Sequence, residues 1–422
     1  MKILIITHFF PPLNSIASLR PYSWAKYWTQ AGHDVTVLTT YKGKNETDLN
    51  LNIEDFNVIE VPFYKFRKSK SVNVEKTEQQ KKRSWIKNKL VNYCEYTGAL
   101  VHIARYPNVF MLWKRPSIKA ILQSNCKFDV AVATHSPHTS FSIAKELKKR
   151  NIVKSVLFDF RDLWTDNHIY KGISCIARYE KNIEAKLCRS ADKITVVSEP
   201  LASILQAKYG KEKISIILNG FDTTDLQSIS PKIYFQDSNI NISFTGSYYK
   251  NLVNLHSLFE AIKQLKNESV PEIGHLKVYF AGARVEQLKD VISQYGLESI
   301  ISCIGFIPRE DALRIQRDAD ILLFLESDSA KTDGVLTGKL FEYMFSGTPI
   351  WTIGKKWQPS RMIEEYGIGK AFGNDVELIK KSLLEVLSGN IPPKYDAMNI
   401  PEIQKYTREY QANEMLKLIE TM

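Results

Sequence analysis

Short apolar runs that alternate with helix-like segments constrain the fold of this chain more than any other feature. Most of the runs are rich in Val, Ile and Phe and show little polar alternation. They cover residues 2–7, 35–40, 58–62, 129–134, 155–160, 193–198 and 214–218, and then 241–245, 276–281, 301–306, 319–325 and 348–353. Strands of a parallel sheet that is covered by helices on both faces have this pattern. The sequence therefore predicts an α/β fold with two doubly wound parallel sheets.

A change of composition after Asn219 and Gly220 predicts the boundary between the two units. Residues 223–239 are rich in Thr, Ser and Asp and lack clear periodicity, which is typical of a linker. Residues 402–422 place apolar side chains at helical spacing, which predicts a final amphipathic helix. With 422 residues, the chain is long enough for two hydrophobic cores. We expect a first domain at 1–218 and a second at 219–401.

Positive charge is concentrated in the first half of the chain. Residues 1–200 contain 32 basic and 18 acidic residues, a net charge of +14, whereas residues 201–422 contain 25 and 28, a net charge of −3. The basic residues are densest between Lys65 and Lys89, beside Trp85 and Ile86. This run predicts either an ordinary solvated face or a docking surface for anionic lipid headgroups. A nucleic-acid interface is the weakest alternative, because no known nucleic-acid-binding motif accompanies the charge.

Several protein classes are excluded by what the sequence does not contain. No apolar stretch approaches the roughly 18 residues that a membrane span needs. The first residues read as a strand and lack the cleavage site of a secretory leader. The five cysteines are scattered and form no C-x-x-C pair, so neither a disulfide framework nor a zinc site is expected. We therefore expect a cytoplasmic protein that requires no metal and no cofactor.

Polar residues follow the strand-like runs of the first half, where open parallel sheets bind their ligands. Ser15 can cap the helix after the first run and leave the N–H groups of that helix for an anion. His138 follows the fourth run. Arg161 and Asp162 follow the fifth, beside Trp164, and this grouping suits a sugar and its phosphate. An internal ion pair between Arg161 and Asp162 is the structural alternative.

The stretch from Asp333 to Ile350 predicts a diphosphate site at the start of a helix. Gly338 has no side chain, so a diphosphate can approach the amides of Gly338, Lys339 and Leu340 at the positive end of the helix dipole. Lys339 supplies a countercharge. Glu342 lies one turn further into the helix, within reach of a ribose diol.

At these residues the chain resembles the family 4 retaining glycosyltransferases. The resemblance depends on the order and spacing of short motifs along nearly the whole chain. They are Phe10-Pro11-Pro12, Trp24-Ala25-Lys26-Tyr27, residues 32–39, Asp159-Phe160-Arg161-Asp162, residues 191–199, residues 217–222, Lys339-Leu340-Phe341-Glu342-Tyr343 and Gly347-Thr348-Pro349. The resemblance implies the GT-B architecture, in which two Rossmann-like domains face a cleft and the final helix crosses back to the first domain.

The resemblance also implies which residues bind the substrates. The second domain would bind a nucleotide sugar, UDP-linked more than GDP-linked, through Ser15 of the first domain and through Gly246, Lys250, Ile307, Asp333, Gly338, Lys339, Leu340 and Glu342. Glu342 matches the second Glu of the family's E-x7-E motif, and the first Glu is replaced by Gly334. Lys250 and Lys339 would stabilise the leaving diphosphate. Arg161, Asp162 and His138 would act in turnover on the acceptor side.

The expected activity is transfer of the sugar, with retention of the anomeric configuration, in surface-polysaccharide synthesis. The acceptor would be a glycan or a polyprenyl-diphosphate-linked glycan, and the basic run would hold the enzyme at the inner face of the cell membrane. A GT-B sugar-nucleotide epimerase is one alternative, and it needs acid and base groups in the cleft. An inactive glycosyltransferase-like binding protein is another, which Gly334 favours and Glu342 opposes.

Overall fold

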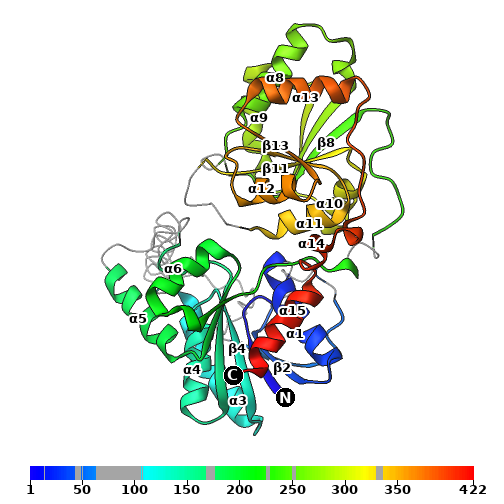
Figure 1. Ribbon diagram of the computed structural model, residues 1–422. Coiled ribbons are helices and arrows are strands. Elements are labelled where there is room, and N and C mark those ends of the chain that lie inside the picture. The colour runs from blue at the N-terminus through cyan, green and yellow to red at the C-terminus, as the bar shows by residue number, and fades with distance from the viewer. Residues whose placement is uncertain are drawn as a thin grey trace, which may run out of the picture. The chain divides into compact units, whose positions relative to one another are not determined.

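The computed structural model divides the chain into two compact units (Figure 1). Unit 1 contains Met1–Leu218 and Ala412–Met422, and unit 2 contains Asn219–Gln411. The structure describes residues 1–13, 15–42, 49, 51–62, 106, 108–167, 176–224, 229–249, 253–328 and 336–422. The basic run from Lys65 to Lys89 lies outside these residues.

Unit 1 contains a parallel sheet with the strand order β3-β2-β1-β4-β5-β6-β7. The strands are β1 (Lys2–Ile6), β2 (Asp34–Thr40), β3 (Asn57–Val61), β4 (Phe128–His135), β5 (Val153–Phe160), β6 (Lys193–Val196) and β7 (Ile214–Ile216). Every strand predicted for the first half is therefore confirmed. The order of the strands reverses between β1 and β4, which makes this pair the topological switch point of the sheet.

Alternate residues of β1 are buried on opposite faces of this sheet. Leu4 and Ile6 pack in one core with helices that follow β3, β4, β5 and β6, whereas Ile3 and Ile5 pack in another core with the first and last helices. The helices are α1 (Ile16–Gln30), the short 3₁₀ helix η1 (Val109–Trp113), α3 (Lys114–Gln123), α4 (Thr139–Lys149), α5 (Ala177–Ser190) and α6 (Glu199–Tyr209). Burial on both faces explains why the strand-like runs show little polar alternation.

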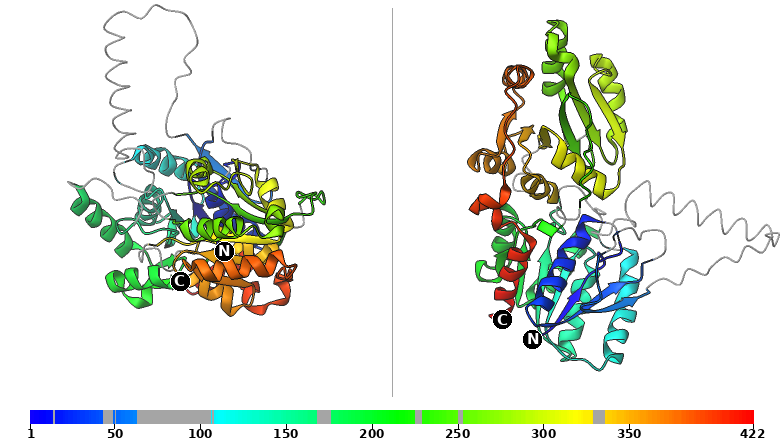
Figure 2. Two further views of the ribbon diagram at one scale, coloured as in Figure 1. Left: turned by 90° about the horizontal axis from the view of Figure 1, so that it is seen from above. Right: turned by 90° about the vertical axis from the view of Figure 1, so that its right-hand side faces the viewer.

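The last helix, α15 (Arg408–Glu420), begins in unit 2 and ends in unit 1. Met415 and Ile419 pack against Trp24 and Trp28 of α1, and the Trp28 indole Nε1 donates to the carbonyl of Ala412 at 2.8 Å. Figures 1 and 2 show α15 beside α1 and the two chain termini close together in unit 1. The predicted return of the final helix to the first domain is confirmed.

The return to unit 1 comes later along the chain than the predicted residue 402. Residues 402–411 belong to unit 2 because their side chains are held there. Tyr406 packs against the ring of Phe341 at 5.2 Å, and Arg408 Nε donates to the carbonyl of Gly220 at 2.9 Å. The second unit therefore ends at Gln411 and not at residue 401.

Unit 2 contains a second parallel sheet, with the strand order β10-β9-β8-β11-β12-β13. The strands are β8 (Ile240–Thr245), β9 (Leu276–Ala281), β10 (Ile301–Gly305), β11 (Ile321–Leu325), β12 (Ile350–Ile353) and β13 (Gly369–Gly373). The first five were predicted. Strand β13 was not, because a glycine stands at each of its ends and only Ala371 and Phe372 are apolar. The switch point lies between β8 and β11.

The two faces of β8 differ in chemistry. Ile242 and Phe244 belong to the hydrophobic core that α8 and α13 cover, whereas the hydroxyl group of Thr245 faces Gln316 of α10 and Tyr343 of α11. The helices of unit 2 are α8 (His256–Asn267), α9 (Lys289–Tyr295), α10 (Arg309–Asp318), α11 (Gly338–Ser346), α12 (Gln358–Glu365), α13 (Val376–Leu387) and α14 (Pro401–Gln404). Strand β8 thereby joins the core of unit 2 to a polar network at its carboxyl end.

The described residues contain neither a membrane-spanning helix nor a metal-binding cluster. None of their helices is both long enough and apolar enough to cross a membrane. The same part of the chain brings together no group of three or more His, Cys, Asp or Glu side chains that is suited to a metal ion. Open parallel sheets bind their ligands at the carboxyl ends of their strands.

Candidate functional site

Two glycines in contact directly follow the carboxyl ends of β8 and β9. Gly246 has a φ of +145° and Gly282 has a φ of +130°, a region that side chains disfavour. A Cβ atom at Gly282 would overlap the backbone of Gly246, so only glycine fits. Because neither residue has a side chain, neither covers the backbone beyond the carboxyl ends of β8 and β9.

The ammonium group of Lys339 lies directly over Gly246. A Cβ atom at Gly246 would overlap Lys339 Nζ, which also lies 4.9 Å from the centre of the Phe244 ring. Burial lowers the pKa of Lys339 from 10.5 to about 8, and the nearby charge of Glu342 opposes this shift. A poorly solvated positive charge therefore lies at the end of β8, where it favours an anionic ligand.

Helix α11 begins beside this ammonium group. Its N-cap residue, Thr337, makes no side-chain capping hydrogen bond. The amide of Leu340 donates to the carbonyl of Thr337 at 3.1 Å, and the side chain of Leu340 is buried. The predicted cradle of three amides is therefore reduced to those of Gly338 and Lys339, at the positive end of the helix dipole.

Glu342 belongs to a polar network that joins α10 and α11. Its side chain is almost buried, and its carboxylate Oε1 lies 2.7 Å from Nη1 of Arg309. Gln316 Nε2 lies 3.5 Å from the other oxygen of Glu342 and donates to the hydroxyl of Thr245 at 2.8 Å. Arg309 and Gln316 were missed by sequence reasoning. Their positions on the helix that follows Gly305, at the end of β10, could have indicated that they lie near the site.

Tyr343 fixes α11 to β8 beside this network. The backbone N–H of Thr245 donates to the Tyr343 hydroxyl at 2.8 Å, and burial raises the pKa of Tyr343 to about 12. The phenol therefore stays protonated at neutral pH. The hydrogen bond between Thr245 and Tyr343 thereby fixes the positions of Lys339 and Glu342, which lie on the same helix, relative to the end of β8.

An exposed aromatic ring marks the loop after β10. Phe306 follows the last strand residue and is 80% exposed, the largest value among the exposed large apolar residues of the described chain. Ile307, which was predicted to bind the donor, is partly buried next to it. Phe306 was missed because an apolar residue that ends a strand-like run is expected to be buried.

The remaining donor-site predictions concern Lys250, Asp333 and Ser15. Lys250 and Asp333 lie outside the described residues, as does Gly334. Ser15 belongs to unit 1, where its hydroxyl accepts from the amide of Ala17 at 3.3 Å and caps α1. Unit 2 therefore assembles Gly246, Gly338, Lys339 and Glu342 within itself.

Arg161 connects three loops of unit 1. Its guanidinium donates to the carbonyls of His135 at 2.9 Å, Ala17 at 3.1 Å and Ser136 at 3.4 Å, and it lies 4.8 Å from the centre of the Phe9 ring. Burial lowers the pKa of Arg161, while the charges of nearby aspartates raise it. The described residues show no direct ion pair between Arg161 and the exposed Asp162, although the charge of Asp162 raises the pKa of Arg161.

A buried ion pair of unit 1 joins Arg20 to Asp159. Arg20 Nη2 lies 2.8 Å from Asp159 Oδ1, and Nε lies 3.2 Å from Oδ2. The hydroxyls of Thr134 and Thr195 donate to Asp159 at 3.0 and 2.9 Å, and Arg20 donates to the carbonyl of Leu218 at 2.6 Å. Sequence reasoning missed this pair, although a carboxylate inside the apolar run of β5 was a signal for it.

His138 lies in aromatic packing beneath the same edge of the sheet. Its ring stacks on Trp164 at 4.6 Å, and only 2% of the residue is exposed. Burial lowers the pKa of His138 to about 4, so the ring is neutral at pH 7. This packing shields the imidazole from solvent, and the role of His138 in turnover stays a prediction.

A second buried cation stands near Arg161. Lys42 Nζ donates to the hydroxyls of Thr39 at 3.1 Å and Thr40 at 2.6 Å. Burial lowers the pKa of His8 to about 2, and the charges of Lys42 and Arg161 add to this shift. The carboxyl edge of unit 1 at β1 and β2 is therefore electropositive. Sequence reasoning did not identify Lys42.

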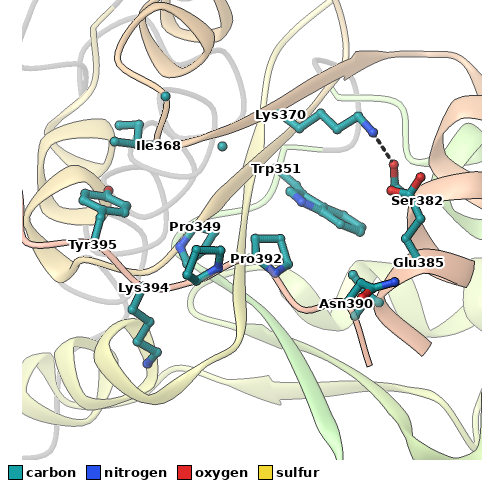
Figure 3. Close-up of a pocket in the computed structure, with 14 residues that line it drawn as sticks. Pro349, Trp351, Ile368, Lys370, Ser382, Glu385, Asn390, Pro392, Lys394 and Tyr395 are labelled. Carbon is teal, nitrogen blue, oxygen red and sulfur yellow. Dashed lines mark hydrogen bonds between the residues drawn. The ribbon is translucent and has the colours of Figure 1, made fainter. Parts of the chain in front are cut away.

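A cavity of about 280 Å³ lies at the other edge of the unit 2 sheet (Figure 3). Pro349 and Gly369, which line it, stand at the amino ends of β12 and β13, and Lys370 Nζ donates to Ser382 Oγ at 2.6 Å beside it. Parallel sheets bind ligands at their carboxyl ends, so this cavity does not extend the candidate site.

Sequence comparison identifies a family for part of the chain. Residues 87–225 match the model of Glycosyltransferase Family 4. No curated protein sequence matches the chain. Within these residues, the match confirms the resemblance that the motifs carry.

Comparison with solved structures identifies the fold. A sucrose-phosphate synthase from Thermosynechococcus elongatus superposes with a TM-score of 0.64 at 13% identity, over 100% of this chain and 98% of that one. The lipopolysaccharide outer core galactosyltransferase WaaB superposes with a TM-score of 0.55 at 12% identity, over 100% and 99%. A putative UDP-N-acetylglucosamine 2-epimerase from Listeria monocytogenes does so with a TM-score of 0.52 at 14% identity, over 100% and 96%. The chain therefore has the GT-B fold.

Proposed function

We propose that this protein transfers a sugar from a nucleoside diphosphate donor to an acceptor. Two findings support the proposal: residues 87–225 match the family 4 glycosyltransferases, and the whole chain has the GT-B fold. One observation carries the proposal: at the start of α11, the ammonium group of Lys339 lies over the backbone of Gly246. A cation, a helix N-terminus and a glycine at a sheet's switch point together suit a diphosphate.

The donor diphosphate would lie between Gly246 and the first turn of α11. As the bond between sugar and phosphate breaks, negative charge develops on the diphosphate, and the Lys339 ammonium and the amides of Gly338 and Lys339 would stabilise it. This arrangement requires no metal ion. Retention of the anomeric configuration and a preference for UDP over GDP follow from the family resemblance and are part of the proposal.

The nucleoside would bind beside the loop after β10. The exposed ring of Phe306 offers a face on which a base can stack, and stacking of this kind contributes about 1–3 kcal/mol. The buried Glu342 would accept hydrogen bonds from the ribose hydroxyls. Phosphate, ribose and base would thus contact β8, α11 and the β10–α10 loop, all of which belong to unit 2.

The acceptor would bind at the carboxyl edge of unit 1. Arg161 and Lys42 make this edge electropositive, which suits an acceptor that carries a phosphate or diphosphate group. A lipid-linked glycan has such a group. The fold shared with a lipopolysaccharide galactosyltransferase supports a role in surface-polysaccharide synthesis.

The binding half of this proposal is tested by calorimetry with UDP and GDP. Wild-type protein is expected to bind UDP more tightly than GDP, and Glu342→Ala is expected to weaken UDP binding by about 1–3 kcal/mol, the range for a hydrogen bond to a charged group. Glu377→Ala is the matched control, because Glu377 is exposed in the first turn of α13. If the two variants bind UDP equally well, Glu342 does not belong to the nucleotide site.

The transfer half is tested by incubating the protein with a panel of nucleotide sugars, with and without a polyprenyl-diphosphate glycan. Release of UDP or GDP only when the acceptor is present is the expected result. Conversion of the donor sugar without an acceptor would indicate an epimerase, and binding without any turnover would indicate an inactive binding protein.

A peripheral attachment to the membrane is the final part of the proposal. Each Lys or Arg close to an anionic bilayer contributes about 1 kcal/mol. The protein is therefore expected to co-sediment with anionic vesicles, and less so in 1 M salt, where the Debye length is about 3 Å. The variant in which Lys81, Lys82, Arg83, Lys87 and Lys89 are changed to Gln should stay in the supernatant.

Neutral vesicles are the control for this sedimentation experiment, since they remove the attraction between charges and keep the bilayer. Equal sedimentation of wild type and variant with anionic vesicles would show that the basic run is an ordinary solvated surface.

A further inference from the structure

The carboxylate of Glu342 is held from one side by Arg309. Arg309 is the first residue of α10, and its Nη1 lies 2.7 Å from Oε1 of Glu342 on α11. The side chains of the pair are 25% and 8% exposed, so solvent screens their attraction only in part. Burial of a carboxylate without a cation is costly, and Arg309 offsets that cost.

The second oxygen of Glu342 is bonded much more weakly. Its nearest donor is Gln316 Nε2 at 3.5 Å, and that amide makes its short hydrogen bond, 2.8 Å long, to the hydroxyl of Thr245. An ionised carboxylate oxygen can accept two hydrogen bonds. Oε1 of Glu342 thus already accepts one strong hydrogen bond, from Arg309, whereas Oε2 accepts none from the described residues and keeps the larger capacity to accept.

A second buried acceptor lies in the same network. Oε1 of Gln316 has no hydrogen-bond partner among the residues that the structure describes, and Gln316 is only 2% exposed. A buried acceptor without a donor carries a desolvation penalty. The network around Glu342 therefore holds two acceptors, Glu342 Oε2 and Gln316 Oε1, that lack a good donor.

We propose that Arg309 is a positioning residue that makes this site selective for ribonucleotides. By holding Oε1 of Glu342, it directs the other oxygen toward the ribose of the donor, where a diol supplies the two hydroxyl donors that the network lacks. A 2′- or 3′-deoxyribose supplies one donor fewer and leaves an acceptor unpaired. The inference rests on the proposed nucleotide-binding function of unit 2.

The test compares the affinities of UDP, 2′-deoxy-UDP and 3′-deoxy-UDP by calorimetry. Wild-type protein is expected to prefer UDP over at least one deoxy analogue by about tenfold or more, the value of a hydrogen bond to a charged group. Arg309→Ala is expected to lose most of that preference. Arg309→Lys is expected to keep part of it, because an ammonium supplies the charge and lacks the rigid fork of a guanidinium.

The matched control is Arg314→Ala. Arg314 lies on the same helix and pairs with Asp311 at 2.9 Å, and no contact with Glu342 is described for it. For Arg314→Ala, the ratio of the affinity for UDP to the affinity for each deoxy analogue should equal the ratio in the wild type. Thermal unfolding of each variant shows whether it is folded, and the Lys variant carries the test if the Ala variant is not.

The outcomes separate this inference from the function on which it rests. If wild-type protein binds no nucleoside diphosphate, the proposed function fails. If UDP binds and Arg309→Ala keeps the wild-type preference for UDP, Arg309 does not position Glu342. A higher UDP affinity in Arg309→Ala would also overturn the inference, because Arg309 would then compete with the ribose for Glu342.

Discussion

Replacement of Lys339 by Met is expected to lower kcat for sugar transfer by about 100–1,000-fold, the loss seen when one donor to a developing negative charge is removed. The ammonium of Lys339 lies over Gly246 beside the start of α11, where the leaving diphosphate would gain charge. Met has a similar length and tolerates burial, so the variant should fold. The measurement is the steady-state rate of UDP release with the donor that the wild type uses.

The pH dependence of UDP binding separates the effect of the charge on Lys339 from the effect of the size of its side chain. Its pKa is lowered to about 8 in the free protein, so the ammonium is present below pH 8 and is lost above it. Bound diphosphate favours the ammonium, so UDP affinity should fall as the pH rises above 8. Lys339→Arg should bind UDP without this fall, because a guanidinium stays charged. The same profile in both proteins would exclude Lys339 from the diphosphate site.

Replacement of Asp159 by Asn is expected to lower the free energy of unfolding by about 3–5 kcal/mol, as for other buried ion pairs that lose one partner. Asp159 is fully buried and accepts hydrogen bonds from Arg20, Thr134 and Thr195. The variant leaves the guanidinium of Arg20 buried without a countercharge. Urea denaturation measures the loss.

The control for this prediction is the exposed pair of Lys417 and Glu414, whose side chains are 72% and 36% exposed. Lys417→Ala should cost less than about 1 kcal/mol, because water screens such a pair. The double variant of Arg20→Met with Asp159→Asn should lose less stability than the sum of the two single variants. A loss in Asp159→Asn no larger than that in Lys417→Ala would contradict the assignment of a buried pair.

The Arg20–Asp159 pair also connects stability to function in unit 1. Asp159 belongs to the same strand end as Arg161, and Thr134 precedes the loop whose carbonyls Arg161 binds. The pair therefore holds the strands that position Arg161 at the electropositive edge. Variants of Arg20 are expected to disturb that edge only through folding, which the denaturation experiment detects.

Prediction from sequence succeeded where the signal is local. Twelve strands were recognised because burial of both sheet faces removes polar residues from short runs, and β13 was missed because its two terminal glycines hide the pattern. Lys339 was recognised because it stands at the start of a helix beside Gly338. Its position over Gly246, far away in the sequence, required the fold.

By itself, the amino-acid sequence determined the two doubly wound sheets, the boundary after Leu218 and the helix that carries Lys339 and Glu342, because the period of apolar residues and the chemistry of helix starts are properties of neighbouring residues. Only the tertiary structure decided the partners of the buried charges. Arg20 and Asp159 are 139 positions apart, and Arg309 and Glu342 are 33 apart. The energy of such a pair depends on distance in space and on exclusion of water, and neither quantity is encoded by spacing along the chain.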